Sequence, residues 1–353
     1  MSNSLDNAGQ PKRKHLFILN PRSFRWTPPV RSVGNTSRQT HIDRTGKITR
    51  EIHAYFVRAG YSDEDYCIFI SRYPRSAFGI INRFMDKIPK DVIVRVYAVG
   101  GDGILFDCLN GIVGLPNVEL ASVPYGTTND FIYAFGDKEA RLFKNLEKQV
   151  NAPAVKTDII YCGSNYALNF CSVGVESESL VHTLKLNQTF ERPISWFRRM
   201  GSFMYMAGGI IGLQNEKVRR QEYTINMDGE ELRGRFALIN IANGPCYGGN
   251  KVPSPSALPD DGLLEVIYMK SGAFLYVTRY ILSYLQGKFY KYPAVFTHKQ
   301  VKKITITSPI PLLVSLDGEV FFDTHLTAEI VPGAVNFVAV DGLPYKRRYS
   351  PHG

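Results

Sequence analysis

Cysteine is scarce in this sequence, and its placement argues against a CxxC redox protein and against a zinc-binding protein. Only five of the 353 residues are cysteines, and they form neither a CxxC pair nor a Cys/His spacing suited to zinc. They are Cys67, Cys108, Cys162, Cys171 and Cys246. An odd number of scattered cysteines is typical of a reducing compartment, so we expect a cytoplasmic protein.

Long apolar runs and a secretion signal are also missing. Residues 1–14 are polar, and the longest apolar stretch, at 203–213, is eleven residues long. A membrane-spanning helix needs about 20 apolar residues. We therefore expect a chain that is not secreted and does not cross a bilayer, and any association with a membrane should be peripheral.

Negative charge is almost absent from the first 50 residues. They hold ten Lys or Arg residues against Asp6 and Asp43, a net charge of +8 out of +10 for the whole chain. This basic region is either a solvated arm or a surface for polyanions or anionic lipid. Nucleic acid is not the expected partner, because no recognition helix, zinc finger or aromatic RNA-binding motif accompanies the charge.

The order of apolar patterns predicts two domains, as the length does. Up to about residue 145, short apolar runs alternate with helical patterns, which predicts an α/β domain over 12–145 with a parallel sheet covered by helices. The expected strands are 15–19, 66–70, 92–99 and 118–123, and the expected helices are 51–60, 78–88 and 104–113.

Residues 146–345 read differently, as a mainly antiparallel β-sandwich domain with hairpin turns at Asp228-Gly229 and Asp317-Gly318. We leave open whether the C-terminal segment returns to the first domain. One helical insert at 192–213 carries an apolar stripe that begins with Trp196, and basic and aromatic residues at 196–199. The stripe is either a buried face or a lipid-contacting one.

The third predicted strand ends in Gly100-Gly101-Asp102-Gly103. In a parallel sheet this is the edge where ligands bind, and glycines there let backbone N–H groups approach a phosphate. A carboxylate among such amides is explained if Asp102 holds Mg²⁺ while the amides hold phosphate oxygens. Alone, the tetrapeptide could equally be a plain turn.

The fourth predicted strand runs into a second polar loop, Pro124-Tyr125-Gly126-Thr127-Thr128-Asn129-Asp130-Phe131. Parallel strands place both loops at the same edge, so the two should form a cleft. Thr127 and Thr128 offer hydroxyl groups to phosphate, and Gly126 allows close backbone approach. Asn129 and Asp130 could instead serve only as helix caps.

These two loops together resemble the diacylglycerol kinase catalytic domain, a family that includes bacterial lipid kinases and sphingosine kinases. The resemblance extends over about residues 15–340. It includes Asn20-Pro21-Arg22-Ser23, Gly201-Ser202-Phe203-Met204-Tyr205, LPDDGLLEV at 258–266 and VSLDGE at 314–319. Ile104, Phe24 and Asp107 depart from the family's usual threonine, glycine and glutamate.

The resemblance implies that ATP lies between the domains, with Mg²⁺ among its phosphates. The nucleotide-binding residues it implies are Asn20, Ser23, Ser71, Arg72, Gly100, Gly101, Asp102, Gly103, Gly126, Thr127, Asn129 and Asp130. A second, structural Mg²⁺ is implied at Asp261 with the backbone carbonyls of Leu258 and Leu263. Without the resemblance, this last site reads as a turn.

Asp317 and Glu319 stand two residues apart after an apolar strand. In an extended chain both side chains would leave the same face of the sheet, although an Asp-Gly turn with a solvated glutamate is the simpler interpretation. The resemblance makes Glu319 the base that accepts the lipid hydroxyl proton and makes Asp317 a residue that positions Mg²⁺ and ATP. Sphingosine kinases suggest Asp102 as the base instead.

The sequence thus predicts an ATP-dependent lipid kinase acting on diacylglycerol or a related lipid at an anionic membrane surface. Three alternatives stay open: a sphingoid-base or ceramide kinase, an NAD kinase-like enzyme, and a non-catalytic lipid or nucleotide sensor on the same fold. A homodimer is neither indicated nor excluded.

Overall fold

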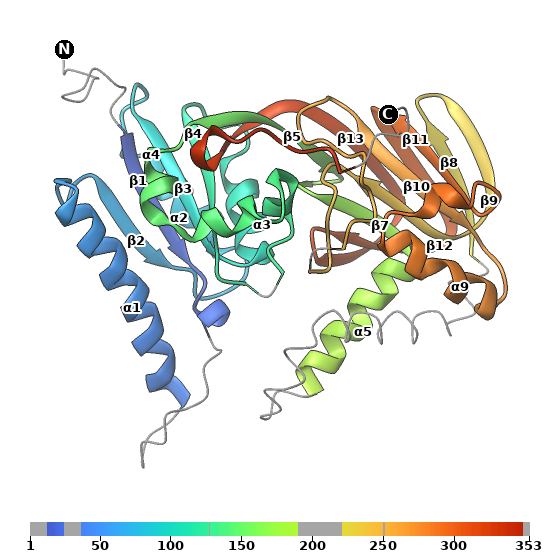
Figure 1. The fold of residues 1–353 in the computed structure, drawn as a ribbon, viewed down its shortest axis with the longest axis horizontal. Coiled ribbons are helices and arrows are strands. Elements are labelled where there is room, and N and C mark those ends of the chain that lie inside the picture. The colour runs from blue at the N-terminus through green and yellow to red at the C-terminus, as the bar shows by residue number, and fades with distance from the viewer. Residues whose placement is uncertain (1–12, 25–36, 127, 190–220, 250, 349–353) are drawn as a thin grey trace. The chain divides into compact units, whose positions relative to one another are not determined.

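The computed structural model describes residues 13–24, 37–126, 128–189, 221–249 and 251–348 (Figure 1). The chain forms two compact units. The first comprises Met1–Thr157 and Ala334–Pro344, and the second comprises Asp158–Gly333 and Tyr345–Gly353. The division falls later in the chain than the 145/146 boundary suggested by the sequence, and the helical insert at 192–213 lies outside the described residues.

The first unit is built on a parallel sheet in the order β2-β1-β3-β4. Its strands are β1 (Arg13–Leu19), β2 (Tyr66–Ile70), β3 (Ile93–Gly100) and β4 (Val118–Pro124). Its helices are α1 (Ser37–Arg58), α2 (Ser76–Met85), α3 (Asp102–Ile112) and α4 (Leu146–Asn151). The strands coincide with the predicted runs, whereas α1 begins well before the predicted residue 51.

Both faces of this sheet are covered, which is why its strands are apolar along most of their length. On one face α1 contributes Ile52 and Phe56 and the segment around α4 contributes Val150, all packed against Phe17 and Tyr97 of the sheet. Helices α2 and α3 pack against each other, and α3 also packs against β3 and β4 (Figure 1).

A buried polar cluster joins the strands of the first unit to the end of α4. The Arg95 side chain is fully buried, and its Nε lies 2.6 Å from Glu119 Oε2, which also pairs with Arg13. Its Nη atoms donate to the carbonyl oxygens of Gln149, Val150 and Ala152. Burial, together with the charges of Arg95 and Arg13, lowers the pKa of His15 to about 3. This residue therefore stays neutral beside the Tyr97 hydroxyl.

The second unit is β-rich and mainly antiparallel, as predicted, with the path β11-β10-β9-β7-β12-β13. The long strands β9 and β12 each pair with both β7 and β8. Its strands, of which β5 and β13 also extend into the first unit, are β5 (Ala154–Cys162), β6 (Asn165–Ala167), β7 (Phe170–Gly174), β8 (Glu222–Met227), β9 (Glu230–Ala242), β10 (Leu264–Lys270), β11 (Phe296–Val301), β12 (Lys303–Leu316) and β13 (Glu319–Val338).

Two helices of this unit, α5 (Val175–Thr189) and α9 (Phe274–Leu285), were not predicted. The expectation of a single helical insert in this half of the chain was therefore wrong. Helix α9 is rich in aromatic and β-branched residues, which favour strands, although its core-facing residues Val277, Ile281 and Tyr284 recur at helical spacing. Val277 and Tyr284 are fully buried in a core that also contains Phe289 and Phe296.

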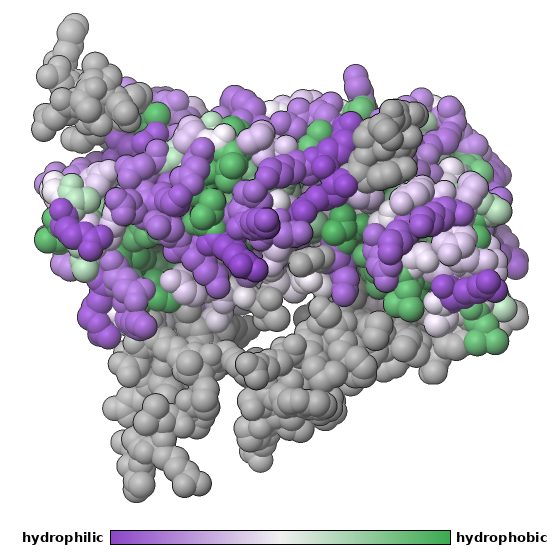
Figure 2. Space-filling view, in the orientation of Figure 1, coloured by the Kyte–Doolittle hydropathy of each residue, from purple (hydrophilic) through white to green (hydrophobic). Residues whose placement is uncertain are grey.

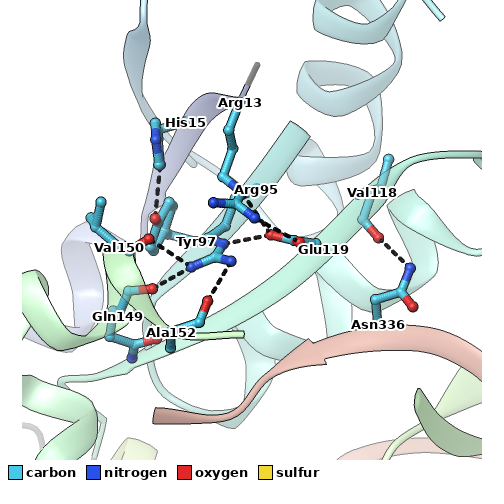
Figure 3. Close-up of polar contacts among 10 residues, drawn as sticks. All are labelled: Arg13, His15, Arg95, Tyr97, Val118, Glu119, Gln149, Val150, Ala152 and Asn336. Atoms are coloured by element: carbon cyan, nitrogen blue, oxygen red, sulfur yellow. Dashed lines mark hydrogen bonds and ion pairs between the residues drawn. The ribbon is translucent and has the colours of Figure 1, made fainter. Parts of the chain in front are cut away.

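The end of β13 belongs to the first unit, where Asn336 and Phe337 pair in parallel with Glu119 and Leu120 of β4. The Asn336 Nδ2 also donates to the Val118 carbonyl at 3.3 Å. Figure 3 shows this Asn336 contact beside the Arg95 cluster. Over much of the described surface the side chains are hydrophilic (Figure 2). In the described part of the chain, no helix is long and apolar enough to span a membrane.

Candidate active site

The Gly-Gly-Asp-Gly loop connects β3 directly to α3, so it lies at the carboxyl edge of the parallel sheet. Gly100 is the last residue of β3, and Asp102 is the first residue of α3. A Cβ on Gly100 would lie 2.7 Å from Ile104 Cγ2 and 2.9 Å from Ser23 Oγ. Only glycine fits there, because the segment after β1, which contains Ser23, and the start of α3, which contains Ile104, both lie against it. Ile104 is buried and fills this junction.

Asp102 joins the two glycine loops through its carboxylate. It accepts hydrogen bonds from Thr128 Oγ1 at 2.5 Å, from Asn129 N at 2.9 Å and from Asp130 N at 2.7 Å. Burial raises the pKa of Asp102, and these hydrogen bonds oppose the shift. The structure therefore gives Asp102 a bracing role in addition to any role toward a ligand.

The loop after β4 meets the Gly-Gly-Asp-Gly loop backbone to backbone. Tyr125 N and Gly126 N both donate to Gly100 O, at 2.7 and 2.9 Å. A Cβ on Gly101 would lie 3.0 Å from the Gly126 Cα, and a Cβ on Gly126 would overlap the Gly101 Cα. Asn129 has φ 54° and exchanges hydrogen bonds with the Gly126 backbone through its side chain.

The remaining predicted nucleotide contacts of the first unit lie at the ends of β1 and β2. Asn20 N donates to Val99 O, and Ser71 N donates to Leu19 O. The Ser71 and Ser76 hydroxyls are 2.7 Å apart. Arg72 and Gly103 are exposed, and no atom lies within 4 Å of a Cβ added to Gly103. Thr127 lies outside the described residues.

One edge of the first unit therefore collects most of the predicted nucleotide-binding residues. The hydrogen bonds and close approaches above join Asn20, Ser23, Gly100, Gly101, Asp102, Gly126, Asn129 and Asp130. Asp107, a departure from the family pattern, accepts a 2.8 Å hydrogen bond from the Arg75 backbone, and Arg75 has φ 62°. Asp107 thus supports the turn that leads into α2.

In the second unit, Asp317 and Gly318 form the turn between β12 and β13, with φ values of 46° and 93°. The backbone at Asp317 is therefore not extended. The prediction that the Asp317 and Glu319 side chains leave the same face of the sheet depended on an extended chain, so it is wrong. The Asp317 carboxylate instead accepts hydrogen bonds from three successive backbone N–H groups, those of Leu168, Asn169 and Phe170. Glu319 is exposed at the start of β13.

Two buried asparagines lie next to this turn and were missed by the sequence analysis. Asn169 Nδ2 donates to Cys246 O, and Asn243 Nδ2 donates to Asp158 O and Leu168 O. Among the described residues, the Oδ1 atoms of Asn169 and Asn243 have no hydrogen-bond partner. They could accept hydrogen bonds from water or a ligand hydroxyl. Each asparagine interrupts an apolar stretch, a signal that could have been noticed.

The predicted structural metal loop holds Asp261 half-buried. Its Oδ1 accepts a hydrogen bond from Leu263 N at 3.1 Å, and its Oδ2 pairs with Arg347 at 3.1 Å. Burial raises the pKa of Asp261 to about 6. Because burial makes the ionised form of Asp261 unfavourable, a bound cation would stabilise that form. Oxygen ligands of this kind are those that Mg²⁺ prefers. No group of three or more His, Cys, Asp or Glu side chains gathers at a common point within the described ranges.

The chain matches two family models that together span much of its length. Residues 43–162 match the diacylglycerol kinase catalytic domain, and residues 191–339 match the YegS C-terminal NAD kinase beta sandwich-like domain. The resemblance seen in the sequence is therefore confirmed.

Two relatives are named as lipid kinases. A YegS-like protein of Shewanella frigidimarina (strain NCIMB 400), named a probable lipid kinase, is 27% identical over 266 residues, which cover 74% of this chain and 82% of that protein. A Staphylococcus aureus (strain MSSA476) protein, named provisionally as a lipid kinase, is 26% identical over 72% of this chain and 79% of its own length.

A crystal structure from Bacillus anthracis (strain Sterne), described provisionally as a diacylglycerol kinase, has the same fold. It superposes with a TM-score of 0.64 and 22% identity over 96% of this chain and 98% of that one.

Proposed function

Since the chain belongs to the lipid kinase family that joins a diacylglycerol kinase catalytic domain to a YegS-type C-terminal domain, we propose that it transfers the γ-phosphate of ATP to a lipid hydroxyl. Diacylglycerol is the preferred acceptor in this proposal. The observation that carries it is the Asp102 clamp, which holds two glycine loops together at the carboxyl edge of the sheet.

The clamp suits a triphosphate for a steric and an electrostatic reason. Gly101 and Gly126 approach without side chains between them, so no Cβ covers the backbone where the two loops meet. The start of α3 adds the positive end of a helix dipole, which favours phosphate.

Residues around Asp102 also fit a divalent cation. Among the described residues its carboxylate has hydrogen-bond donors but no ion-pair partner, and burial raises its pKa. A bound Mg²⁺ would neutralise charge on the phosphates during transfer. Asp261, with the carbonyl groups of Leu258 and Leu263, is our proposed site for a second Mg²⁺ of structural importance.

We assign proton transfer to Glu319 and positioning to Asp317. Both oxygens of Asp102 already accept hydrogen bonds, which supports Glu319 over Asp102 as the base. Glu319 is exposed, and the adjoining turn is fixed because three backbone N–H groups hold Asp317. In the proposed step the lipid oxygen bonds to the γ-phosphorus, the bond to the β-phosphate oxygen breaks, and Glu319 accepts the hydroxyl proton.

The test is transfer of label from γ-³²P-ATP to a panel of acceptors by the purified chain. The panel contains detergent-dispersed diacylglycerol, sphingosine, ceramide and, for the NAD kinase alternative, NAD. Labelled phosphatidic acid as the main product supports the proposal. Label in NAD, or no transfer to any acceptor, would contradict it, and preference for another lipid would correct the acceptor only.

A further inference from the structure

Helix α9 has a buried face and an exposed face of unusual composition. Val277 and Tyr284 are fully buried against the core of the second unit. Leu275, Arg279 and Leu282 are exposed, and the two leucines keep 77% and 50% of their accessible surface. Their spacing of four and three residues places them on one side of the helix.

The segment after α9 continues this composition. Tyr290 and Tyr292 are 42% and 37% exposed, and Lys288 and Lys291 are exposed between and beside them. The Tyr292 ring lies 5.0 Å from that of Tyr280, which stands on α9, so helix and segment are in contact. We call the following residues the α9 surface: Leu275, Arg279, Leu282, Lys288, Tyr290, Lys291 and Tyr292.

Negative charge is missing from a long stretch of sequence around this surface. Residues 266–316 contain no Asp or Glu and seven Lys or Arg residues. Two of the seven, Lys299 and Lys303, are neutralised by Glu230 and Glu329. The acids behind α9 point inward: Glu176 accepts from Tyr284 in the core, and Glu265 is buried beside His298. Of the other five cations, Arg279, Lys288 and Lys291 are exposed on the α9 surface, which is therefore positively charged.

We propose that the α9 surface docks on an anionic lipid bilayer. Figure 2 shows green apolar and purple hydrophilic side chains side by side over the position that α9 has in Figure 1. Exposed leucines can enter the acyl region, tyrosines favour the headgroup level, and lysine and arginine keep their charges among the phosphates. A protein partner would need a complementary acidic and apolar face, whereas an anionic bilayer offers both properties everywhere.

This inference rests on the proposed function, because docking would serve a lipid kinase whose substrate is held in a membrane. Its test does not need turnover. Binding of the full chain is measured by co-sedimentation with vesicles of phosphatidylcholine alone and of phosphatidylcholine mixed with phosphatidylglycerol, without ATP.

Two double variants probe the two kinds of contact. Leu275→Ser with Leu282→Ser removes the apolar part, and Lys288→Glu with Lys291→Glu reverses two charges. The charge-reversal variant is expected to weaken binding to anionic vesicles at least about tenfold, since one basic residue near such a surface contributes about fivefold. The leucine variant is expected to weaken binding by a similar factor, because it removes two apolar side chains that would be buried among the acyl chains. The matched controls Val57→Ser and Lys87→Glu change exposed residues of the first unit and should bind like the unchanged chain.

An environment-sensitive fluorophore on Leu275→Cys gives a second measurement, with Val57→Cys as its control. A blue shift at position 275 alone on anionic vesicles supports docking through α9. Equal binding of the double variants and the controls, equal binding to neutral vesicles, or no binding at all would overturn the proposal. Activity on detergent-dispersed lipid is measured separately, so a chain that docks through α9 but transfers no phosphate contradicts the kinase and not the docking.

Discussion

The Asp102 side chain shows how much of a site a sequence can predict. A carboxylate inside a glycine loop at the end of a buried strand indicates a phosphate and metal site, and the loop does lie at that edge. The hydrogen bonds from Thr128 and from the Asn129 and Asp130 backbones could not be predicted, because they depend on how two loops about 25 residues apart meet.

Asp102→Asn should remove most kinase activity and also lower the thermal midpoint, because the amide NH2 group would face a donor whose hydrogen bond the carboxylate now accepts. An amide cannot provide the negative charge that a metal requires, and metal-assisted charge neutralisation contributes several kcal/mol to such a transition state. The assay is kcat for lipid phosphorylation, together with the thermal midpoint. Asp86→Asn, at an exposed position after α2, serves as the control. Near-normal turnover by a folded Asp102→Asn protein would be incompatible with our assignment.

Glu176, at the start of α5, predicts a pH dependence of stability. Its carboxyl group is buried between Tyr284 and Asn240, and burial raises its pKa to about 8. Between its unfolded pKa, near 4.5, and about 8, the folded state binds more protons than the unfolded state. The free energy of unfolding should therefore fall as pH rises through this range, by at most about 5 kcal/mol.

Glu176→Gln should remove this part of the pH dependence. Denaturant unfolding at pH 5, 6.5 and 8 measures it, and the informative quantity is the difference between variant and unchanged chain. Glu178→Gln, on the same helix beside His182, is the control. A difference that stays constant with pH would show that Glu176 does not carry the raised pKa.

Among the helices and strands, the sequence predicted those with a clear period. The strands of the first unit were found, and the mainly antiparallel character of the second unit is confirmed. Helix α9 was missed although Val277, Ile281 and Tyr284 recur at helical spacing, because its β-branched and aromatic residues also favour a strand; in the structure it packs in a core that includes Phe289 and Phe296.

The turns show a second limit of local sequence. Asp317-Gly318-Glu319 and Asp228-Gly229-Glu230 have the same letters and nearly the same backbone, with φ values of 46° and 50° at the two aspartates. Asp228 accepts from the Lys302 and Lys303 backbones, and Glu230 pairs with Lys299. Nothing within either tripeptide tells which one belongs to an active site.

The contact between the two glycine loops gives a prediction on stability. Gly126→Ala places a Cβ onto the Gly101 Cα and should lower the free energy of unfolding by about 1–3 kcal/mol. Gly103→Ala is the steric control, since nothing lies within 4 Å of its added Cβ. Urea denaturation of both variants measures the difference. Equal stability would mean that the loops do not approach as closely as described.

For the protein as a whole, the division into units could be predicted only coarsely. The end of β13 returns to pair with β4 across more than 200 residues of sequence, and no local pattern indicates such a partner. The basic N-terminal residues and the 192–213 insert lie mostly outside the described ranges, so their proposed membrane contacts stay predictions.

Magnesium should stabilise the second unit through Asp261. We expect the thermal midpoint of the full chain to rise with Mg²⁺ and to fall back with EDTA, because a ligand that binds only the folded state stabilises it. Asp261→Asn should abolish this response, whereas Asp260→Asn, on the exposed neighbour, should keep most of it. An unchanged response in Asp261→Asn would assign the loop to an ordinary turn held by Arg347.

The central claim is most directly tested by the steady-state kinetics of diacylglycerol phosphorylation in Glu319→Gln and Glu230→Gln. The two variants alter the same residue type after the same Asp-Gly turn. We predict that Glu319→Gln lowers kcat by at least about 100-fold with little change in the KM for ATP, because its contact is with the attacking hydroxyl. Glu230→Gln should retain normal kinetics. Equal kcat values for the two variants, or a loss of ATP affinity at normal kcat in Glu319→Gln, would contradict the assignment of Glu319 as the base.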